Sequence, residues 1–195
     1  MRKSSIQRKT NETNISLSLN IDGTGEHNIS TGIGFFDHML TQIAVHGLID
    51  IDLQAEGDLH IDAHHTIEDC GIVLGEGIGQ ALGQKLGIRR MAEASVPMDD
   101  ALAKVILDLS GRPYSVIQTK WVSPSVGNIP TSLLEHFFET LVVSSRMNLH
   151  INVLYGKDNH HMAEALFKAF ARALDAAVQV DERRAGVVPS SKGKI

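Results

Sequence analysis

A motif that occurs twice constrains the fold of this chain more than any other feature. His64-His65-Thr66-Ile67-Glu68 returns 96 positions later as His160-His161-Met162-Ala163-Glu164, and the acid-histidine pair at 37–38 returns 98 positions later at 135–136. Self-similarity at a long, nearly constant offset is typical of an internal duplication. We therefore expect a single domain, residues 1–195, made of two halves of about 1–95 and 96–195 that are related by a pseudo-twofold axis.

The order of the predicted elements supports this duplication. Apolar residues that alternate with polar ones predict strands near 15–21, 27–31, 49–53, 101–109, 114–117 and 149–153, with a further short strand at Leu59 and Ile61. Apolar spacings of three and four predict helices over 35–46, 66–86, 131–147 and 160–178. Each half then has the order strand-strand-helix-strand-helix, which predicts an α+β fold with helices packed on mixed sheets.

Four local features of the sequence carry more specific predictions. The second helix contains four glycines, which either weaken it by up to about 1 kcal/mol each or let another backbone approach closely; they are Gly71, Gly75, Gly77 and Gly79. Thr131 or Ser132, with Glu135, forms a candidate capping box for the third helix. Residues 124–130 are expected to be a loop, and the tail 181–195 has the composition of a frayed terminus.

Composition excludes several classes of protein. The chain has 18 basic and 23 acidic residues, a net charge of −5. It therefore lacks the basic character of proteins that bind nucleic acids or anionic membranes. Its single cysteine, Cys70, cannot form an internal disulfide. No apolar run approaches the roughly 18 residues that cross a bilayer, and no signal-peptide pattern is present. We therefore expect a cytoplasmic protein.

The spacing within the repeated motif predicts two metal sites. On a helix, His64 and Glu68 project from one face, whereas His65 points about 100° away and should serve a different ion. If the two copies face each other, one ion receives His64, Glu68 and His161, and the other receives their counterparts; these are His160, Glu164 and His65. His38 and His136, which the repeat also relates, are candidates for a further ligand on each ion.

The chemistry of these ligands favours certain ions. A shell of histidine nitrogens and carboxylate oxygens without thiolate suits octahedral Mn²⁺ or Fe²⁺ with open positions, and Zn²⁺ is the alternative. The competing interpretation is two solvated helix N-termini at which histidine happens to be frequent and glutamate favours the helix dipole. Two copies at matching offsets favour the metal sites.

Longer motifs extend through nearly the whole chain, and with them the sequence resembles the imidazoleglycerol-phosphate dehydratases of histidine biosynthesis. They are Gly32-Ile33-Gly34-Phe35-Phe36-Asp37-His38-Met39-Leu40, Asp62-Ala63-His64-His65-Thr66-Ile67-Glu68-Asp69, Pro97-Met98-Asp99-Asp100-Ala101-Leu102, Ser110-Gly111-Arg112-Pro113, His160-His161-Met162-Ala163-Glu164 and Pro189-Ser190-Ser191-Lys192-Gly193. The resemblance implies four-stranded mixed sheets in a ribosomal protein S5 domain 2-like fold. It also implies two Mn²⁺ per active site, and sites assembled between the subunits of a twenty-four-subunit homo-oligomer. No residues remain for the phosphatase domain that some members carry.

The resemblance also implies a reaction, a metal-dependent elimination of water from imidazole glycerol phosphate, D-erythro-1-(imidazol-4-yl)glycerol 3-phosphate. The product is imidazole acetol phosphate, 3-(imidazol-4-yl)-2-oxopropyl phosphate, which makes the enzyme a hydro-lyase. Glu12 matches the family's N-terminal acidic position and is the candidate base, with Glu68 and Glu164 as rivals.

The candidate substrate-binding residues come from several parts of the chain. Arg90 and Arg112 match the family's phosphate-binding arginines, and the C-terminal donors are matched by Ser190 and Lys192. Gln42 is a candidate to reach substrate hydroxyls, and Asp99 is a candidate to orient a ligand or a substrate hydroxyl. The stretch 91–95, directly after Arg90, departs from the family pattern, and only the Gly-Ile-x-Arg spacing selects Arg90 over Arg89.

Two other functions use the same ligands. A di-metal hydrolase would activate water on the ions, but the excess of histidine over bridging carboxylate disfavours it. A metal-dependent assembly or storage protein would not need the candidate phosphate-binding residues; these are Arg90, Arg112, Ser190 and Lys192. Release of free phosphate would indicate the hydrolase, and substrate-dependent turnover separates both alternatives from the dehydratase.

Overall fold

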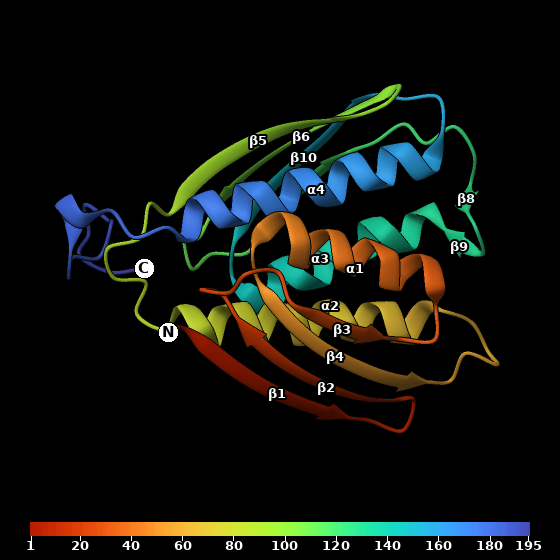
Figure 1. The fold of residues 1–195 in the computed structure, drawn as a ribbon, viewed down its shortest axis with the longest axis horizontal. Coiled ribbons are helices and arrows are strands. Elements are labelled where there is room, and N and C mark those ends of the chain that lie inside the picture. The colour runs from red at the N-terminus through yellow and green to blue at the C-terminus, as the bar shows by residue number, and fades with distance from the viewer.

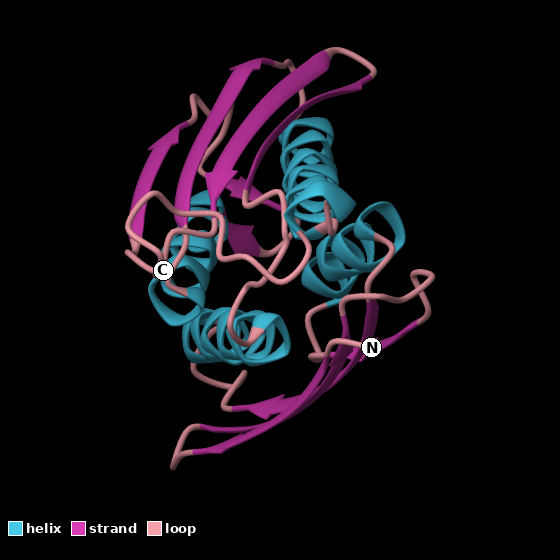
Figure 2. Cartoon of the chain, turned by 90° about the vertical axis from the view of Figure 1, so that its left-hand side faces the viewer, coloured by secondary structure: helices cyan, strands magenta, loops and turns pink.

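Residues 1–195 are described by a computed structural model, in which two four-stranded sheets enclose a layer of four helices. Figure 1 shows the first sheet at the bottom, the second at the top and the helices between them. Figure 2, turned by 90°, shows the same helices lying across the inner faces of both sheets. The apolar residues of both halves meet in this layer as one continuous core.

Each half has the same topology. The first half contains β1 (Lys3–Lys9), β2 (Thr13–Asn20), β3 (His27–Ser30), α1 (Gly34–Gly47), β4 (Asp50–Gly57) and α2 (His64–Leu82), with sheet order β1-β2-β4-β3. The second contains β5 (Met91–Met98), β6 (Ala101–Asp108), β7 (Tyr114–Gln118), α3 (Thr131–Ser145), β10 (Asn148–Tyr155) and α4 (Asn159–Val178), with order β5-β6-β10-β7. In both sheets the last pair is parallel and the others are antiparallel. The predicted α+β duplication is confirmed.

The sequence missed the first strand of each half. β1 has only one large apolar side chain, Ile6, and β5 contains two alanines and Pro97, so neither shows a run of large apolar residues at alternate positions. Both are edge strands, with one neighbour each. Because β5 pairs with β6, the second sheet begins at Met91, a few residues before the boundary expected near 95.

Three other local predictions were wrong. Leu59 and Ile61 form no strand and lie exposed in the loop before α2. Residues 124–130 are not a plain loop, because β8 (Ser125–Val126) and β9 (Ile129–Pro130) pair as a small hairpin. No side chain caps α3, and Glu135 instead accepts hydrogen bonds from Thr119 and the Trp121 indole.

The glycines of α2 allow a close helix contact. A Cβ at Gly71 would lie 2.3 Å from Thr140 Oγ1, and one at Gly75 would lie 2.6 Å from the Leu141 carbonyl oxygen. Both neighbours belong to α3, so these two glycines let the α3 backbone approach α2. The helix ends at Leu82, earlier than expected, because Gly83 takes a positive φ of 51°.

The C-terminal tail contains little regular structure. It has one turn of 3-10 helix, η1 (Glu182–Arg184), and it follows directly on a bridge between Val180 and Ile88. None of the helices combines the length and the apolar character that a membrane span requires.

Candidate functional site

The four helices begin at the same end of the molecule, on the right in Figure 1. The repeated motifs open α2 and α4, while His38 lies in the first turns of α1 and His136 in those of α3. The duplicated fold therefore gathers the histidines at one end, in two separate clusters.

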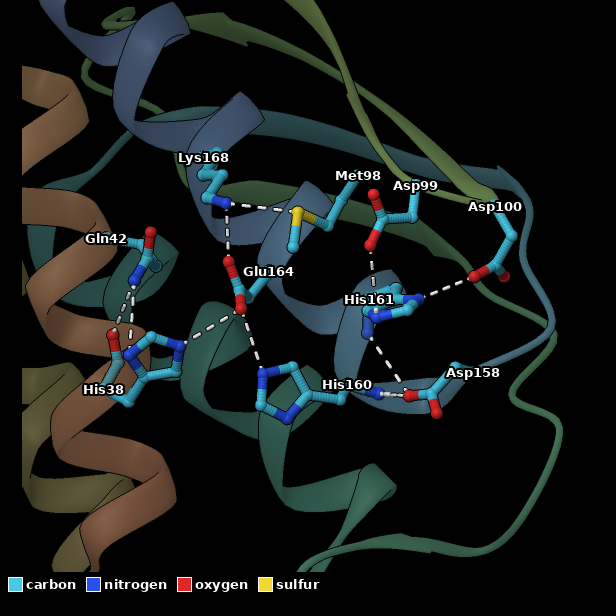
Figure 3. A network of polar contacts seen from close by, with 10 residues as sticks. All are labelled: His38, Gln42, Met98, Asp99, Asp100, Asp158, His160, His161, Glu164 and Lys168. Atoms are coloured by element: carbon cyan, nitrogen blue, oxygen red, sulfur yellow. Dashed lines mark hydrogen bonds and ion pairs between the residues drawn. The ribbon is translucent and has the colours of Figure 1, made fainter.

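The first cluster joins α1 and α4. Nε2 of His38 lies 3.1 Å from Oε1 of Glu164, and Nε2 of His160 lies 2.9 Å from the same oxygen. Figure 3 shows both rings converging on this carboxylate. The ligand atoms of these residues all lie within 4.8 Å of one another, so they can reach a single ion.

The second cluster joins α2 and α3 in the equivalent way. Oε2 of Glu68 lies 3.5 Å from Nε2 of His64 and 3.6 Å from Nε2 of His136. Nε2 of His136 is buried and has no hydrogen-bond partner. Because an unpaired buried nitrogen is costly, this atom is suited to bind a metal ion.

Each cluster contains three of the ligands expected for one ion. His64 and Glu68 are joined by His136, and the second motif is joined by His38, while His161 and His65, the ligands expected from the opposite motif, lie outside the clusters of the single chain. The helix spacing correctly separated each motif's two histidines, but it could not show which helices lie side by side.

His65 and His161 have surroundings of their own. Nδ1 of His65 lies 3.0 Å from Asp58 Oδ2, and its Nε2 lies 3.7 Å from Glu12 Oε1. Nδ1 of His161 lies 2.6 Å from Asp100 Oδ1, and its Nε2 lies 3.6 Å from Asp99 Oδ2. About a third of each histidine side chain is exposed, 32% for His65 and 30% for His161.

These contacts shift the pKa values of the histidines. The hydrogen bond to Asp58 raises the pKa of His65, and the bond to Asp100 raises the pKa of His161, in each case against a smaller opposing effect of desolvation. The pKa of Asp100 is lowered, first by His161 and then by the backbone N–H of Lys157.

Lys168 contacts the first cluster and was not predicted from the sequence. Its Nζ lies 2.5 Å from Oε2 of Glu164 and also contacts the sulfur of Met98. Burial alone would raise the pKa of Glu164, but the hydrogen bonds from Lys168, His38 and His160 lower it to about 2. The i,i+4 spacing from Glu164 was the signal for this contact.

Three of the predicted substrate and base candidates lie at the histidine end. Gln42 is buried, with Nε2 3.4 Å from Nδ1 of His38. Glu12 and Asp99 stand on the turns of the β1–β2 and β5–β6 hairpins, beside the rings of His65 and His161.

The four phosphate-binding candidates lie elsewhere. The backbone N–H of Arg90 donates to Ala177, which is seventeen residues beyond His160 and so about 25 Å further along α4. The Arg90 side chain is held by Asp108 and by the Pro189 carbonyl, which brings Ser190 and Lys192 to the same end. Arg112 is exposed. Its neighbour Gly111 accepts a hydrogen bond from Arg146, which ends α3, so Arg112 lies near the C-terminal end of that helix. A single chain does not bring these residues to its own histidines.

Comparisons with known proteins find matches along most of the chain. A sequence model of imidazoleglycerol-phosphate dehydratase matches residues 31–174. Relatives of that name from Chloroflexus aurantiacus and Acetivibrio thermocellus are each 55% identical, covering 99% and 100% of this chain and 94% and 99% of their own.

Solved structures are similar as well. The crystal structure of imidazoleglycerol-phosphate dehydratase from Staphylococcus aureus has a TM-score of 0.83 at 35% identity, over 92% of this chain and 99% of that one. The enzyme from Pyrococcus furiosus, in complex with (S)-C348, has a TM-score of 0.84 at 34% identity, over 97% and 100% of the two chains. Matched along its length in sequence and in fold, the chain belongs to the imidazoleglycerol-phosphate dehydratase family.

Proposed function

We propose that this protein removes water from imidazole glycerol phosphate to give imidazole acetol phosphate, a step of histidine biosynthesis. The observation that carries the proposal is the pair of His₂Glu clusters, set by an internal duplication at one end of a chain of this family. Glu12 and Gln42 lie beside the histidines, where a substrate bound there would meet them.

The two clusters are the proposed sites of two Mn²⁺ ions. Each offers two imidazole nitrogens and one carboxylate without thiolate, and the unpartnered Nε2 of His136 fits a metal ligand. His65 and His161 complete the proposed ligand set from positions that face away from their own chain's clusters. When bound, the ions would supply Lewis-acid stabilisation of the electron density that develops on the substrate's imidazole ring.

Among the candidate bases, the structure favours Glu12. The carbon-bound proton is not activated by a carbonyl, so the reaction needs a free carboxylate close to it. Glu164 is engaged by two histidines and Lys168, which makes it a weak base, and Glu68 faces two histidines. Glu12 belongs to neither cluster, and 54% of its side chain is exposed to receive substrate.

The site is proposed to form between subunits. Arg112, Ser190 and Lys192 lie at the opposite end of the chain from the histidines, so a substrate held by both must lie between two copies. This supports self-association, for which the family resemblance implies a twenty-four-subunit assembly. The unpaired, buried thiol of Cys70 fits the cytoplasmic location expected from the sequence.

The direct test is to incubate the purified protein with imidazole glycerol phosphate and to measure both imidazole acetol phosphate and free phosphate. We expect the first and not the second. Glu12→Gln should lower kcat by about 10²- to 10⁴-fold and leave the bound metal unchanged, because it removes only the base. Glu56→Gln, an exposed position on β4, is the matched control and should keep full activity.

Two results would contradict the proposal. Release of free phosphate in place of imidazole acetol phosphate would indicate a hydrolase. Full activity of Glu12→Gln would remove Glu12 from the role of base and return it to Glu68 or Glu164.

A further inference from the structure

Two aspartates that belong to neither metal cluster contact the outward-facing histidines. Asp58 directly follows β4, and its side chain meets Nδ1 of His65 with both oxygens, at 3.0 and 3.2 Å. Asp100 stands on the β5–β6 turn and meets Nδ1 of His161 at 2.6 Å. In both pairs the carboxylate contacts the same ring nitrogen.

A carboxylate at Nδ1 determines which nitrogen can bind a metal. It accepts the Nδ1–H of the neutral ring, so Nε2 carries the lone pair and the ring is held in one orientation. Metal-bound histidines commonly have such a partner on the other nitrogen. Here it leaves Nε2 of His65 and of His161 as the available ligand atoms.

Both aspartates are themselves held in place. The backbone N–H of Asp58 donates to the carbonyl of Glu12 at 3.1 Å, and only 13% of the Asp58 side chain is exposed. Asp100 accepts a hydrogen bond from the backbone N–H of Lys157. A hydrogen bond fixes the backbone of Asp58 and the carboxylate of Asp100, so each side chain can restrict the ring that it contacts.

The two halves make the same contact from different elements. β1 and β5 begin 88 residues apart, and so do β2 and β6. The turn residue equivalent to Asp100 is therefore Glu12. Glu12, however, lies 3.7 Å from Nε2 of His65 and makes no contact with Nδ1. β4 and β10 begin 98 residues apart, so the residue equivalent to Asp58 is Gly156. The Nδ1 contact is thus built twice and is not a simple copy.

We propose that Asp58 and Asp100 are positioning residues, which hold His65 and His161 with Nε2 directed outward to bind the metal of a neighbouring copy of this chain. The inference deepens the proposed function and rests on it, because it requires both histidines to be metal ligands. It also explains the difference between the hairpins: Asp58 serves the ring of His65, and Glu12 is left free to act as base.

The test compares four variants of the full-length protein, each of which removes one negative charge. Asp58→Asn and Asp100→Asn keep the side chain's shape, but the new amide can donate to Nδ1 and favour the tautomer with a proton on Nε2. Asp62→Asn and Asp158→Asn are the matched controls, because these carboxylates accept only from backbone N–H groups at the starts of α2 and α4. Asparagine keeps that capping role.

We expect Mn²⁺ to bind about 10- to 100-fold more weakly to Asp58→Asn and Asp100→Asn, as measured by the paramagnetic resonance of free Mn²⁺ during titration. The controls should bind Mn²⁺ as the wild type does. In metal-free protein labelled with ¹⁵N-histidine, the two positioning variants should move one ring's proton from Nδ1 to Nε2, which a loss of stability alone would not do. Assembly size and melting temperature verify folding.

The outcomes separate this inference from the proposed function. Unchanged Mn²⁺ affinity in Asp58→Asn and Asp100→Asn, with weakened binding in His65→Ala and His161→Ala, would overturn the positioning role alone. Unchanged affinity in the histidine variants would overturn the ligand assignment, and the positioning role with it. Equal losses in all four aspartate variants would indicate a general effect of charge and also overturn the inference.

Discussion

At the scale of single residues, the histidines differ in which ring nitrogen is engaged. His38 and His160 point Nε2 at Glu164, whereas His65 and His161 use Nδ1 to contact aspartates. Residues of the same type within one motif therefore have different chemical roles. The partner of the second nitrogen decides which atom remains for a ligand.

The aspartate contacts predict how stability depends on pH in the metal-free protein. Asp58 and Asp100 raise the pKa values of His65 and His161 above the ordinary 6.5, so the folded state binds these protons more tightly than the unfolded state. The resulting stabilisation is fully present below pH 6.5 and is lost as the pH rises through the folded-state pKa values.

Urea unfolding of chelator-treated protein between pH 5.5 and 8.5 checks this prediction. The free energy of unfolding should fall more with rising pH in the wild type than in the double variant Asp58→Asn/Asp100→Asn. Parallel curves for the two proteins would show that these pairs contribute nothing to the pH dependence.

Prediction from sequence reached some site residues and not others. The histidines and glutamates were found because the duplication repeats them at constant offsets. Lys168, Asp58 and Asp100 were missed as partners. The contact of Asp100 with His161 depends on a hairpin turn meeting a distant helix start, which no local spacing encodes.

At the scale of elements, the contact between α2 and α3 depends on two glycines of α2, Gly71 and Gly75. A methyl group at Gly75 would lie 2.6 Å from the Leu141 carbonyl and 2.7 Å from Cβ of Ser144, so the helices would have to separate. At Gly79, one turn later, the nearest atom of another element would be 3.9 Å away.

Gly75→Ala should therefore destabilise the protein by about 1–3 kcal/mol, although alanine favours the helix. Gly79→Ala should stabilise it by up to about 1 kcal/mol, because it has room for the methyl group. Urea unfolding of both variants tests the pair. A stabilised Gly75→Ala would mean that α2 and α3 are not held as closely as described.

Most elements followed from hydrophobic periodicity, and the failures have physical causes. The four helices and the central strands bury continuous apolar faces, which the sequence displays. β1 and β5 are edge strands with few large apolar residues, so their pairing is determined by the neighbouring strands. The capping box failed because Glu135 has partners in Thr119 and Trp121, which come from outside the helix.

At the scale of the whole molecule, the end that carries the histidines and the end that carries Arg90, Arg112 and Lys192 are separated by the length of a helix. The duplication was visible in the sequence, and the topology confirms it. The separation was not visible, because motif order does not reveal which ends of the strands carry which residues. It is the basis for proposing a site between copies.

A site between copies predicts that two inactive variants restore each other. His64→Ala removes a proposed metal ligand, and Arg112→Ala removes a proposed phosphate ligand at the opposite end. Co-expressed in equal amounts, they should form mixed assemblies with about a quarter of the wild-type activity, because intact contributions from two chains combine by chance. Mixed assemblies no more active than their parents would place both contributions in one chain.

The most direct test of the central claim is turnover of imidazole glycerol phosphate during a Mn²⁺ titration of chelator-stripped protein, with bound metal counted in parallel. The account predicts that imidazole acetol phosphate forms as about two ions bind per chain, one for each cluster. Full turnover by the stripped protein would contradict the metal sites, and two bound ions without product would contradict the proposed reaction.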